Sequence, residues 1–313
     1  MLHYMARLVA LFTLLLATPA FGQQLPWIPF SWSGTTLAGR HFDKAAIMVP
    51  VTLDNLPHRF LMQLDLGAVT TVVYGNPLQP YLEKYPALKA KLDTTRTFRM
   101  QSQKNAMLTH VALKLGPVSF GQRDVGTFKN FGDSLTAAAL ADAHPVHIGT
   151  VGPDLFQGKV LVIDYPHQRF CVTDKVPAAF AHASFQPFKL KDGRIKIPLR
   201  INNVTQDLLF DTGSSLFALL TTRPRAAALA PGAVQDSVKT STWGTYYYVY
   251  GRRVQAPVYF GRQPLPTALV YADNLDKFAD FYRQENIWGI TGNAYFLHNV
   301  VIIDYRNHVF GVQ

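Results

Sequence analysis

The sequence predicts a mainly β protein that folds as two lobes with a few short helices. Apolar runs of strand length, broken by glycine and proline turns, occur along most of the chain. Only two stretches, Leu135 to Ala143 and Leu275 to Glu285, look helical. In addition, two sequence units occur twice in the same order, and this repeat is the main evidence for two lobes.

The first repeated unit is a strand hairpin that leads into an Asp-x-Gly turn. The strand-like runs Ala46 to Asn55 and Ile195 to Asn203 share a proline and an asparagine in matching places. They lead to Asp65-Leu66-Gly67-Ala68 and to Asp211-Thr212-Gly213-Ser214-Ser215, respectively. A strand that stops at Asp and turns at Gly holds its carboxylate among backbone N–H groups. A single Asp-x-Gly turn between strands is common and does not by itself indicate a site. Two such turns with matching strands before them do indicate one.

The second repeated unit recurs at a constant offset of 140 residues, from Gly149 to Gly289. Nine positions are identical between the two copies: Gly149, Gly152, Phe156, Val160, Ile163, Asp164, Tyr165, Phe170 and Val172 with their partners. Chance similarity of two strands would not keep glycines, an aspartate and a tyrosine in step. We therefore place an N-terminal lobe at 23–178 and a C-terminal lobe at 179–313, joined through a polar, proline-containing linker.

Residues 1–22 are predicted to be a secretory signal peptide. Arg7 precedes an apolar run from Leu8 to Leu16, and Ala20-Phe21-Gly22 is a small-x-small cleavage site. The apolar run is shorter than the roughly 18 residues that a membrane span needs, and no later stretch reaches that length. The chain is thus expected to be exported, to the periplasm or beyond it, with no membrane span.

Composition narrows the class of protein further. With 48% hydrophobic and 16% charged residues, the chain has the composition of a globular protein with a sizeable core. The net charge of +10 comes from dispersed residues, so it does not indicate nucleic-acid binding but is compatible with contact to an anionic envelope surface. Cys171 is the one cysteine, which excludes an intramolecular disulfide and favours a bacterial source. Its strand-like surroundings predict a buried, inert thiol.

Two carboxylates that face each other cannot both ionise easily, so they share one proton and titrate as a pair. One can then act as a base and the other as an acid on a water molecule between them. Asp65 and Asp211 are the candidates for this pair, and peptide hydrolysis without a covalent intermediate is the chemistry it suggests. The sequence does not select which of them holds the proton.

The chain resembles the pepsin-like and retropepsin-like aspartic peptidases over most of its length after the signal peptide. The resemblance rests on Asp211-Thr212-Gly213-Ser214-Ser215 and on the element Thr150-Val151-Gly152 with its counterpart Ile290-Thr291-Gly292. It implies two β-rich lobes related by a pseudo-two-fold axis, a cleft between them, and one catalytic aspartate from each lobe. Asp65 and Asp211 would be catalytic, with Gly67, Thr212, Gly213 and Ser214 holding the carboxylates. It implies no metal and no organic cofactor.

Leu66 departs from the family pattern. Family members have a buried threonine after each aspartate, and its hydroxyl group bonds to the opposite loop. Leu66 cannot supply this group, so the hydroxyl of Thr212 is expected to lack its partner. Ala68 agrees with retroviral members, which also have alanine there.

The region that would close over the substrate departs as well. Thr97 to Leu108 takes the place of the first-lobe flap but has neither its tyrosine nor its glycines. Trp243 to Tyr248 forms an aromatic hairpin in the second lobe, which either covers the cleft or packs on its own sheet as strand aromatics commonly do.

Three functions remain open at this point. The first is an exported, monomeric aspartic endopeptidase that acts on polypeptides. The second is a catalytically impaired scaffold that binds peptides or the envelope. The third, hydrolysis of a glycan by the same carboxylates, is disfavoured because glycosidases hold their carboxylates at least about 5 Å apart. His144 and His147 flank Pro145, which disfavours the helix that would direct them to one metal ion.

Overall fold

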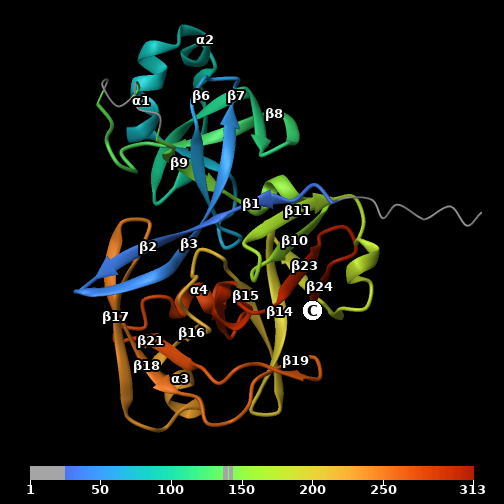
Figure 1. Cartoon of the computed structure of the whole chain (residues 1–313). Helices are drawn as coiled ribbons and strands as arrows, with labels where there is room; N and C mark the ends of the chain where they lie inside the picture. The colour runs from blue at the N-terminus through green and yellow to red at the C-terminus, as the bar shows by residue number, and fades with distance from the viewer. Residues whose placement is uncertain (1–24, 137–139, 141–143) are drawn as a thin grey trace, which may run out of the picture.

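The computed structural model describes residues 25–136, 140 and 144–313. The predicted signal peptide lies outside the described residues, and so does most of the predicted helix from Leu135 to Ala143. Strands account for 51% of the structure and helices for 13%, which confirms the predicted mainly β class. The strands form three sheets (Figure 1).

The N-terminal sheet has eight strands in the order β2-β3-β4-β9-β5-β8-β7-β6. Their bounds are β2 (Ser31–Leu37), β3 (Arg40–Leu53), β4 (Phe60–Leu64), β5 (Val72–Tyr74), β6 (Leu92–Met100), β7 (Gln103–Leu115), β8 (Val118–Phe128) and β9 (Val146–Val151). The predicted strand at Ala46 is the second half of β3, which pairs in turn with β2, β4 and β7 along its length.

The C-terminal sheet has ten strands, nine of them in the order β17-β18-β21-β16-β22-β15-β14-β19-β20, while β13 pairs with β14. Their bounds are β13 (Lys189–Lys191), β14 (Arg194–Ile201), β15 (Val204–Phe210), β16 (Leu219–Thr221), β17 (Val234–Thr242), β18 (Thr245–Arg253), β19 (Tyr259–Phe260), β20 (Gln263–Pro264), β21 (Leu269–Asp273) and β22 (Gly289–Thr291).

A third sheet of six strands, in the order β1-β11-β10-β23-β24-β12, lies between the other two (Figure 1). Its strands are β1 (Ile28–Pro29), β10 (Val160–Asp164), β11 (Arg169–Thr173), β12 (Ser184–Pro187), β23 (Val300–Asp304) and β24 (Val309–Val312). The two copies of the second repeated unit meet here, because β10 pairs directly with β23. Both parts of the chain therefore contribute to one sheet.

The helices are short. They are α1 (Gly75–Lys84), α2 (Pro86–Lys89), α3 (Arg223–Leu229) and α4 (Ala279–Gln284), with 3-10 turns η2 (Pro153–Phe156), η3 (Ala178–Phe180) and η4 (Asn293–Tyr295). Two of the helices contact inner strands of the sheets: α1 contacts β5 and β9, and α3 contacts β21. The helix predicted from Leu275 to Glu285 is confirmed as α4, which begins four residues later than predicted.

The same strand pairings occur in the N-terminal and the C-terminal sheet. In the first, β4 pairs in parallel with β9, and β9 pairs antiparallel with β5. In the second, β15 pairs in parallel with β22, and β22 pairs antiparallel with β16. The strands β4 and β15, which lead to the two Asp turns, therefore have equivalent neighbours. A rotation axis between the two halves stays a prediction.

The main hydrophobic core runs through all three sheets and includes Leu64, Leu66, Phe210 and Tyr165. Residues just before each Asp turn are thus anchored in the core, which fixes the turns. Cys171 is fully buried in β11, as predicted, and burial raises the pKa of its thiol to about 12. Among the described residues, no helix is long and apolar enough to cross a membrane.

Candidate active site

The fold brings the two Asp turns together. Asp65 directly follows β4 and Asp211 directly follows β15, and the carboxyl group of each packs against the glycine of the other turn. A Cβ atom on Gly213 would lie 2.7 Å from Cγ of Asp65. A Cβ atom on Gly67 would lie 2.7 Å from Oδ2 of Asp211 and closer still to its Cγ. Neither glycine has a positive φ, so each is required because the opposite carboxylate packs against it.

Backbone donors hold both carboxylates in place. Each accepts hydrogen bonds from the next residues of its own turn: Gly67 (2.9 Å) and Ala68 (3.0 Å) for Asp65, and Gly213 (2.8 Å) and Ser214 (3.3 Å) for Asp211. The hydroxyl of Ser214 also donates to Oδ2 of Asp211 at 2.8 Å. Ala68, the corresponding residue beside Asp65, has no hydroxyl, so the pair is asymmetric.

The electrostatics of the pair favour the protonated form of Asp65. Burial of the carboxyl group, the negative charge of Asp211 and the hydrogen bond between the two raise the pKa of Asp65 well above its usual range. The backbone N–H groups of Ala68 and Gly67 act in the opposite direction but do not cancel this. A protonated Asp65 beside an acceptor is the arrangement that an acid–base pair requires.

The hydroxyl of Thr212 has partners, which corrects one expectation from the sequence. It donates to the carbonyl of Leu64 at 2.8 Å and accepts from the backbone N–H of Leu66 at 2.9 Å. The expectation was wrong because both partners are backbone groups, which are present whatever side chain follows Asp65. The side chain of Leu66 is fully buried in the core instead. One threonine is therefore enough to tie the two turns together.

Replacing Thr212 with valine is expected to destabilise the protein. The change leaves the N–H of Leu66 and the carbonyl of Leu64 without this partner in the interior, at a cost of about 1 to 3 kcal/mol in the free energy of unfolding. Urea unfolding measures it. Thr291→Val is the matched control, because the hydroxyl of Thr291 is buried without a hydrogen-bond partner. Equal stability of the two variants would contradict this role for Thr212.

Asn293 supports the turn of Asp211 and was missed in the sequence. Its side-chain amide donates to the carbonyl of Thr212 at 3.0 Å and to the hydroxyl of Ser215 at 2.9 Å. Its carbonyl oxygen accepts from the hydroxyl of Tyr165 at 2.6 Å. The available signal was its position, directly after the repeated Gly292. Tyr165, which the repeat singled out, thus connects the six-stranded sheet to the site.

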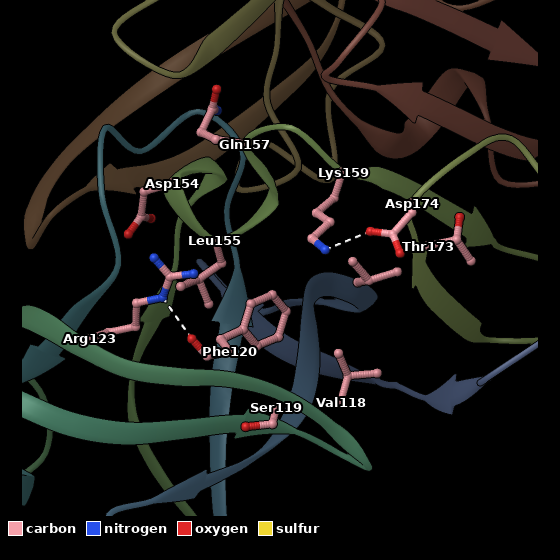
Figure 2. A pocket seen from close by; sticks show the side chains of 11 residues that line it. Val118, Ser119, Phe120, Arg123, Asp154, Leu155, Gln157, Lys159, Thr173 and Asp174 are labelled. Atoms are coloured by element: carbon pink, nitrogen blue, oxygen red, sulfur yellow. Dashed lines mark hydrogen bonds and ion pairs between the residues drawn. The ribbon is translucent and has the colours of Figure 1, made fainter.

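Asp154 supports the turn of Asp65 from behind. Its Oδ1 accepts from both the backbone N–H (2.7 Å) and the hydroxyl (2.8 Å) of Thr71, and the Thr71 hydroxyl accepts from the N–H of Gly152 at 3.0 Å. Burial raises the pKa of Asp154. Figure 2 shows its carboxylate beside a cavity of about 320 Å³ between β8 and η2, where Arg123 also points. Neither Asp65 nor Asp211 lines this cavity.

The two segments that were compared with the flap of aspartic peptidases form two separate hairpins. The region from Thr97 to Leu108 lies in the β6–β7 hairpin, with Gln101 and Ser102 at its tip. The aromatic segment lies in the β17–β18 hairpin, with Trp243 and Gly244 at its tip. Tyr247 packs against the C-terminal core, as the second interpretation expects, whereas Trp243 packs against residues of the N-terminal sheet. That the hairpin covers a cleft stays a prediction.

The other polar residues considered in the sequence, Asp164, Asp304 and His147, lie beside other protein groups that can bond to them. The Asp164 carboxylate accepts from Arg169 at 2.8 Å, and Asp304 accepts from backbone N–H groups of its own turn, so both are structural turns as predicted. His147 lies near Gly149, whose carbonyl is 3.0 Å from its Nε2 atom. Within the described part of the chain, no three His, Cys, Asp or Glu side chains are grouped as a metal site.

Comparison with known proteins gives no family. No model of a protein family matches the chain, and no curated protein matches it either. A function for the protein is therefore inferred from the geometry of Asp65, Asp211 and their turns.

Proposed function

We propose that the protein is an aspartic endopeptidase in which Asp65 and Asp211 activate one water molecule. The observation that supports this most directly is the close packing of the two turns, in which the carboxyl group of each aspartate lies against the glycine of the other turn. Both aspartates keep part of their surface exposed, so water and substrate can reach them. The pattern of residues 1–22 supports an exported protein that acts in the periplasm or outside the cell.

From the asymmetry of the pair we infer which aspartate acts as the base and which as the acid. Asp211, with the hydroxyl of Ser214 on one oxygen, takes a proton from the water as the water attacks the scissile carbonyl carbon. Asp65, whose pKa is raised, gives its proton to the carbonyl oxygen. The resulting tetrahedral diol collapses when Asp211, now protonated, gives its proton to the nitrogen of the leaving amine and the C–N bond breaks. Asp65 takes a proton back from one hydroxyl group of the diol, which restores the starting protonation of the pair.

Cleavage of a denatured protein tests the proposal. Asp65→Asn and Asp211→Asn are each expected to lose at least about 10²-fold in kcat/KM, the lower end of what one acid–base group contributes. Assays between about pH 3 and 7 span the range in which a carboxyl pair shares one proton. Equal cleavage by the wild type and both variants would contradict the proposal, whereas no cleavage by a correctly folded wild type would favour a peptide-binding scaffold.

The pH dependence of the wild type follows from the raised pKa of Asp65. The form with a protonated Asp65 is active, so cleavage is expected to fall as the pH rises through the folded-state pKa of Asp65.

The stability of the fold is expected to change in the same direction. The contribution of Asp65 to the free energy of unfolding is complete below the pKa that Asp65 has in the unfolded chain. It is lost as the pH rises through the raised pKa of the folded protein. Asp65→Asn removes this loss and is therefore expected to melt at a higher temperature than the wild type at neutral pH, as calorimetry would show.

A further inference from the structure

The cavity between β8, η2 and the end of β11 takes no part in the proposed cleavage. Its volume of about 320 Å³ is at the lower end of the roughly 300 to 1,000 Å³ that small-molecule sites occupy. It is open to solvent, because the side chains of Lys159 and Asp174 that line it are 47% and 74% exposed. Other parts of its wall are apolar, since Leu155 and Val172 are buried and Phe120 packs against the main core. The cavity therefore has room for a ligand the size of one residue.

Two charged groups that line the cavity have no ionic partner. Figure 2 shows the guanidinium group of Arg123 and the carboxyl group of Asp154 on the same side of the cavity. In the described part of the chain, Arg123 forms no ion pair, and its Nε atom donates to the carbonyl of Phe120 at 2.9 Å. Asp154 forms no ion pair there either, although its Oδ1 atom accepts from Thr71. A bound molecule could therefore bridge the two groups.

The charges around the cavity favour an anionic ligand. Lys159 pairs with Asp174 at 2.6 Å, so these two side chains neutralise each other. Arg306 approaches the same region, because it donates to the carbonyl of Gly158 at 3.3 Å. Lys159, and to a smaller extent Arg306, lower the pKa of Asp174. Within the described residues, the charged groups at and beside the cavity are Arg123, Lys159, Arg306, Asp154 and Asp174. The three cations exceed the two carboxylates by one charge.

A ligand that bridges the two unpaired groups must offer an acceptor to Arg123 and a donor to Asp154. The C-terminal residue of a peptide offers both, because its carboxylate and its amide N–H are attached to the same carbon atom. A guanidinium group binds a carboxylate through two parallel hydrogen bonds. An ionised phosphate group, in contrast, supplies mainly acceptor oxygens.

We propose that this cavity is a binding site for the C-terminal residue of a peptide. The carboxylate of the peptide binds Arg123, and its last amide N–H donates to Asp154. An apolar side chain on the last residue packs against Leu155 and Val172. A free amino acid carries a carboxylate and an ammonium group at the same positions, so the experiment compares it with the peptide.

The site rests on the proposed peptidase function only for the source of its ligand. Each cleavage of a peptide bond leaves one product with a new C-terminal carboxylate, which is the group that the cavity would bind. Asp154 also holds Thr71, on the segment that follows the turn of Asp65. A product in the cavity would therefore contact a residue that supports the aspartate pair. Binding itself is measured without any cleavage.

NMR titration of the protein with acetyl-alanyl-leucine and with its C-terminal amide tests the proposal. The methyl groups of Leu155 and Val172 report on binding in the cavity, because both residues line it. We expect the acid to bind at least about tenfold more tightly than the amide, since the loss of hydrogen bonds to a charged group has an effect of that order. Free leucine is expected to bind more weakly than the peptide acid. Equal or tighter binding of free leucine would overturn the assignment to peptide ends.

Arg123→Gln removes the charge from an exposed position and is expected to abolish the preference for the acid over the amide. Arg262→Gln, an exposed arginine outside the cavity lining, is the matched control and should keep the preference. Equal binding of acid and amide by the wild type, or an unchanged preference in Arg123→Gln, would overturn the site. If the wild type binds the acid here but cleaves nothing, the peptidase proposal fails and the site stands. If it cleaves but does not distinguish acid from amide, the site fails and the peptidase proposal stands.

Discussion

A Gly67→Ala variant is expected to lose at least about 10²-fold in kcat/KM although it removes no catalytic atom, because small misplacements of reacting groups have effects of that size. The added Cβ would overlap the carboxylate of Asp211, which lies within 2.7 Å of that position. The two turns must then move apart, which separates the two carboxyl groups. Assays of peptide cleavage, with circular dichroism to confirm folding, measure the effect.

Gly232→Ala is the matched control for this experiment. A Cβ atom there meets nothing within 4 Å, and Gly232 does not have a positive φ, so activity should be retained. Gly213→Ala should behave like Gly67→Ala, since its Cβ would overlap Asp65. A folded Gly67→Ala variant with wild-type activity would show that the close approach of the turns is not needed for function.

A Glu285→Gln variant is expected to lose about 3 to 5 kcal/mol in the free energy of unfolding, the cost of leaving buried charges unpaired. Glu285 lies after α4 and pairs with Arg194 at 2.8 Å and Lys196 at 3.1 Å, both on β14, and with Lys191 at 3.3 Å. The side chains of Arg194, Lys196 and Glu285 are almost completely buried. Removing the charge of Glu285 would leave Lys196 without a carboxylate partner and Arg194 with only Asp192 at 4.0 Å. Urea unfolding near neutral pH measures the loss.

The surface pair of Asp280 and Arg283 provides the control for Glu285. Both side chains are about three-quarters exposed, so Asp280→Ala should cost less than about 1 kcal/mol in the free energy of unfolding.

The contribution of Glu285 to stability also depends on pH. Burial acts to raise its pKa, but the Lys196 hydrogen bond and the charges of Arg194 and Lys196 outweigh this, so the pKa is lowered. Its contribution is therefore present above the unfolded value and is lost as the pH falls; a pH-independent difference between Glu285→Gln and the wild type would contradict this account.

The sequence was sufficient for the parts of the site that depend on repeated local structure. The turns at Asp65 and Asp211 could be predicted because a strand, an aspartate and a glycine follow one another in both copies. Their proximity followed from the order of the repeats. The partners of Thr212 could not be predicted, because they are the backbone groups of Leu64 and Leu66, which carry no sequence signal.

Contacts between segments that are distant in the sequence could not be predicted either. The alternation of residues in Trp243 to Tyr248 predicts a strand but not which surface its tip will contact. The contact of Trp243 with Phe128 and Phe131 depends on how the two sheets lie relative to each other. For the same reason Asn293 could not be assigned to the turn of Asp211, since its polar partners come from two separate segments, that turn and Tyr165.

Titration of the Asp65 carboxyl carbon by NMR is the most direct test of the central claim, that two aspartates distant in the chain share one proton. We expect Asp65 to titrate well above the usual range of an aspartate, and its pKa to fall in Asp211→Asn while staying raised by burial. A normal pKa for Asp65, unchanged when Asp211 is replaced, would contradict the account.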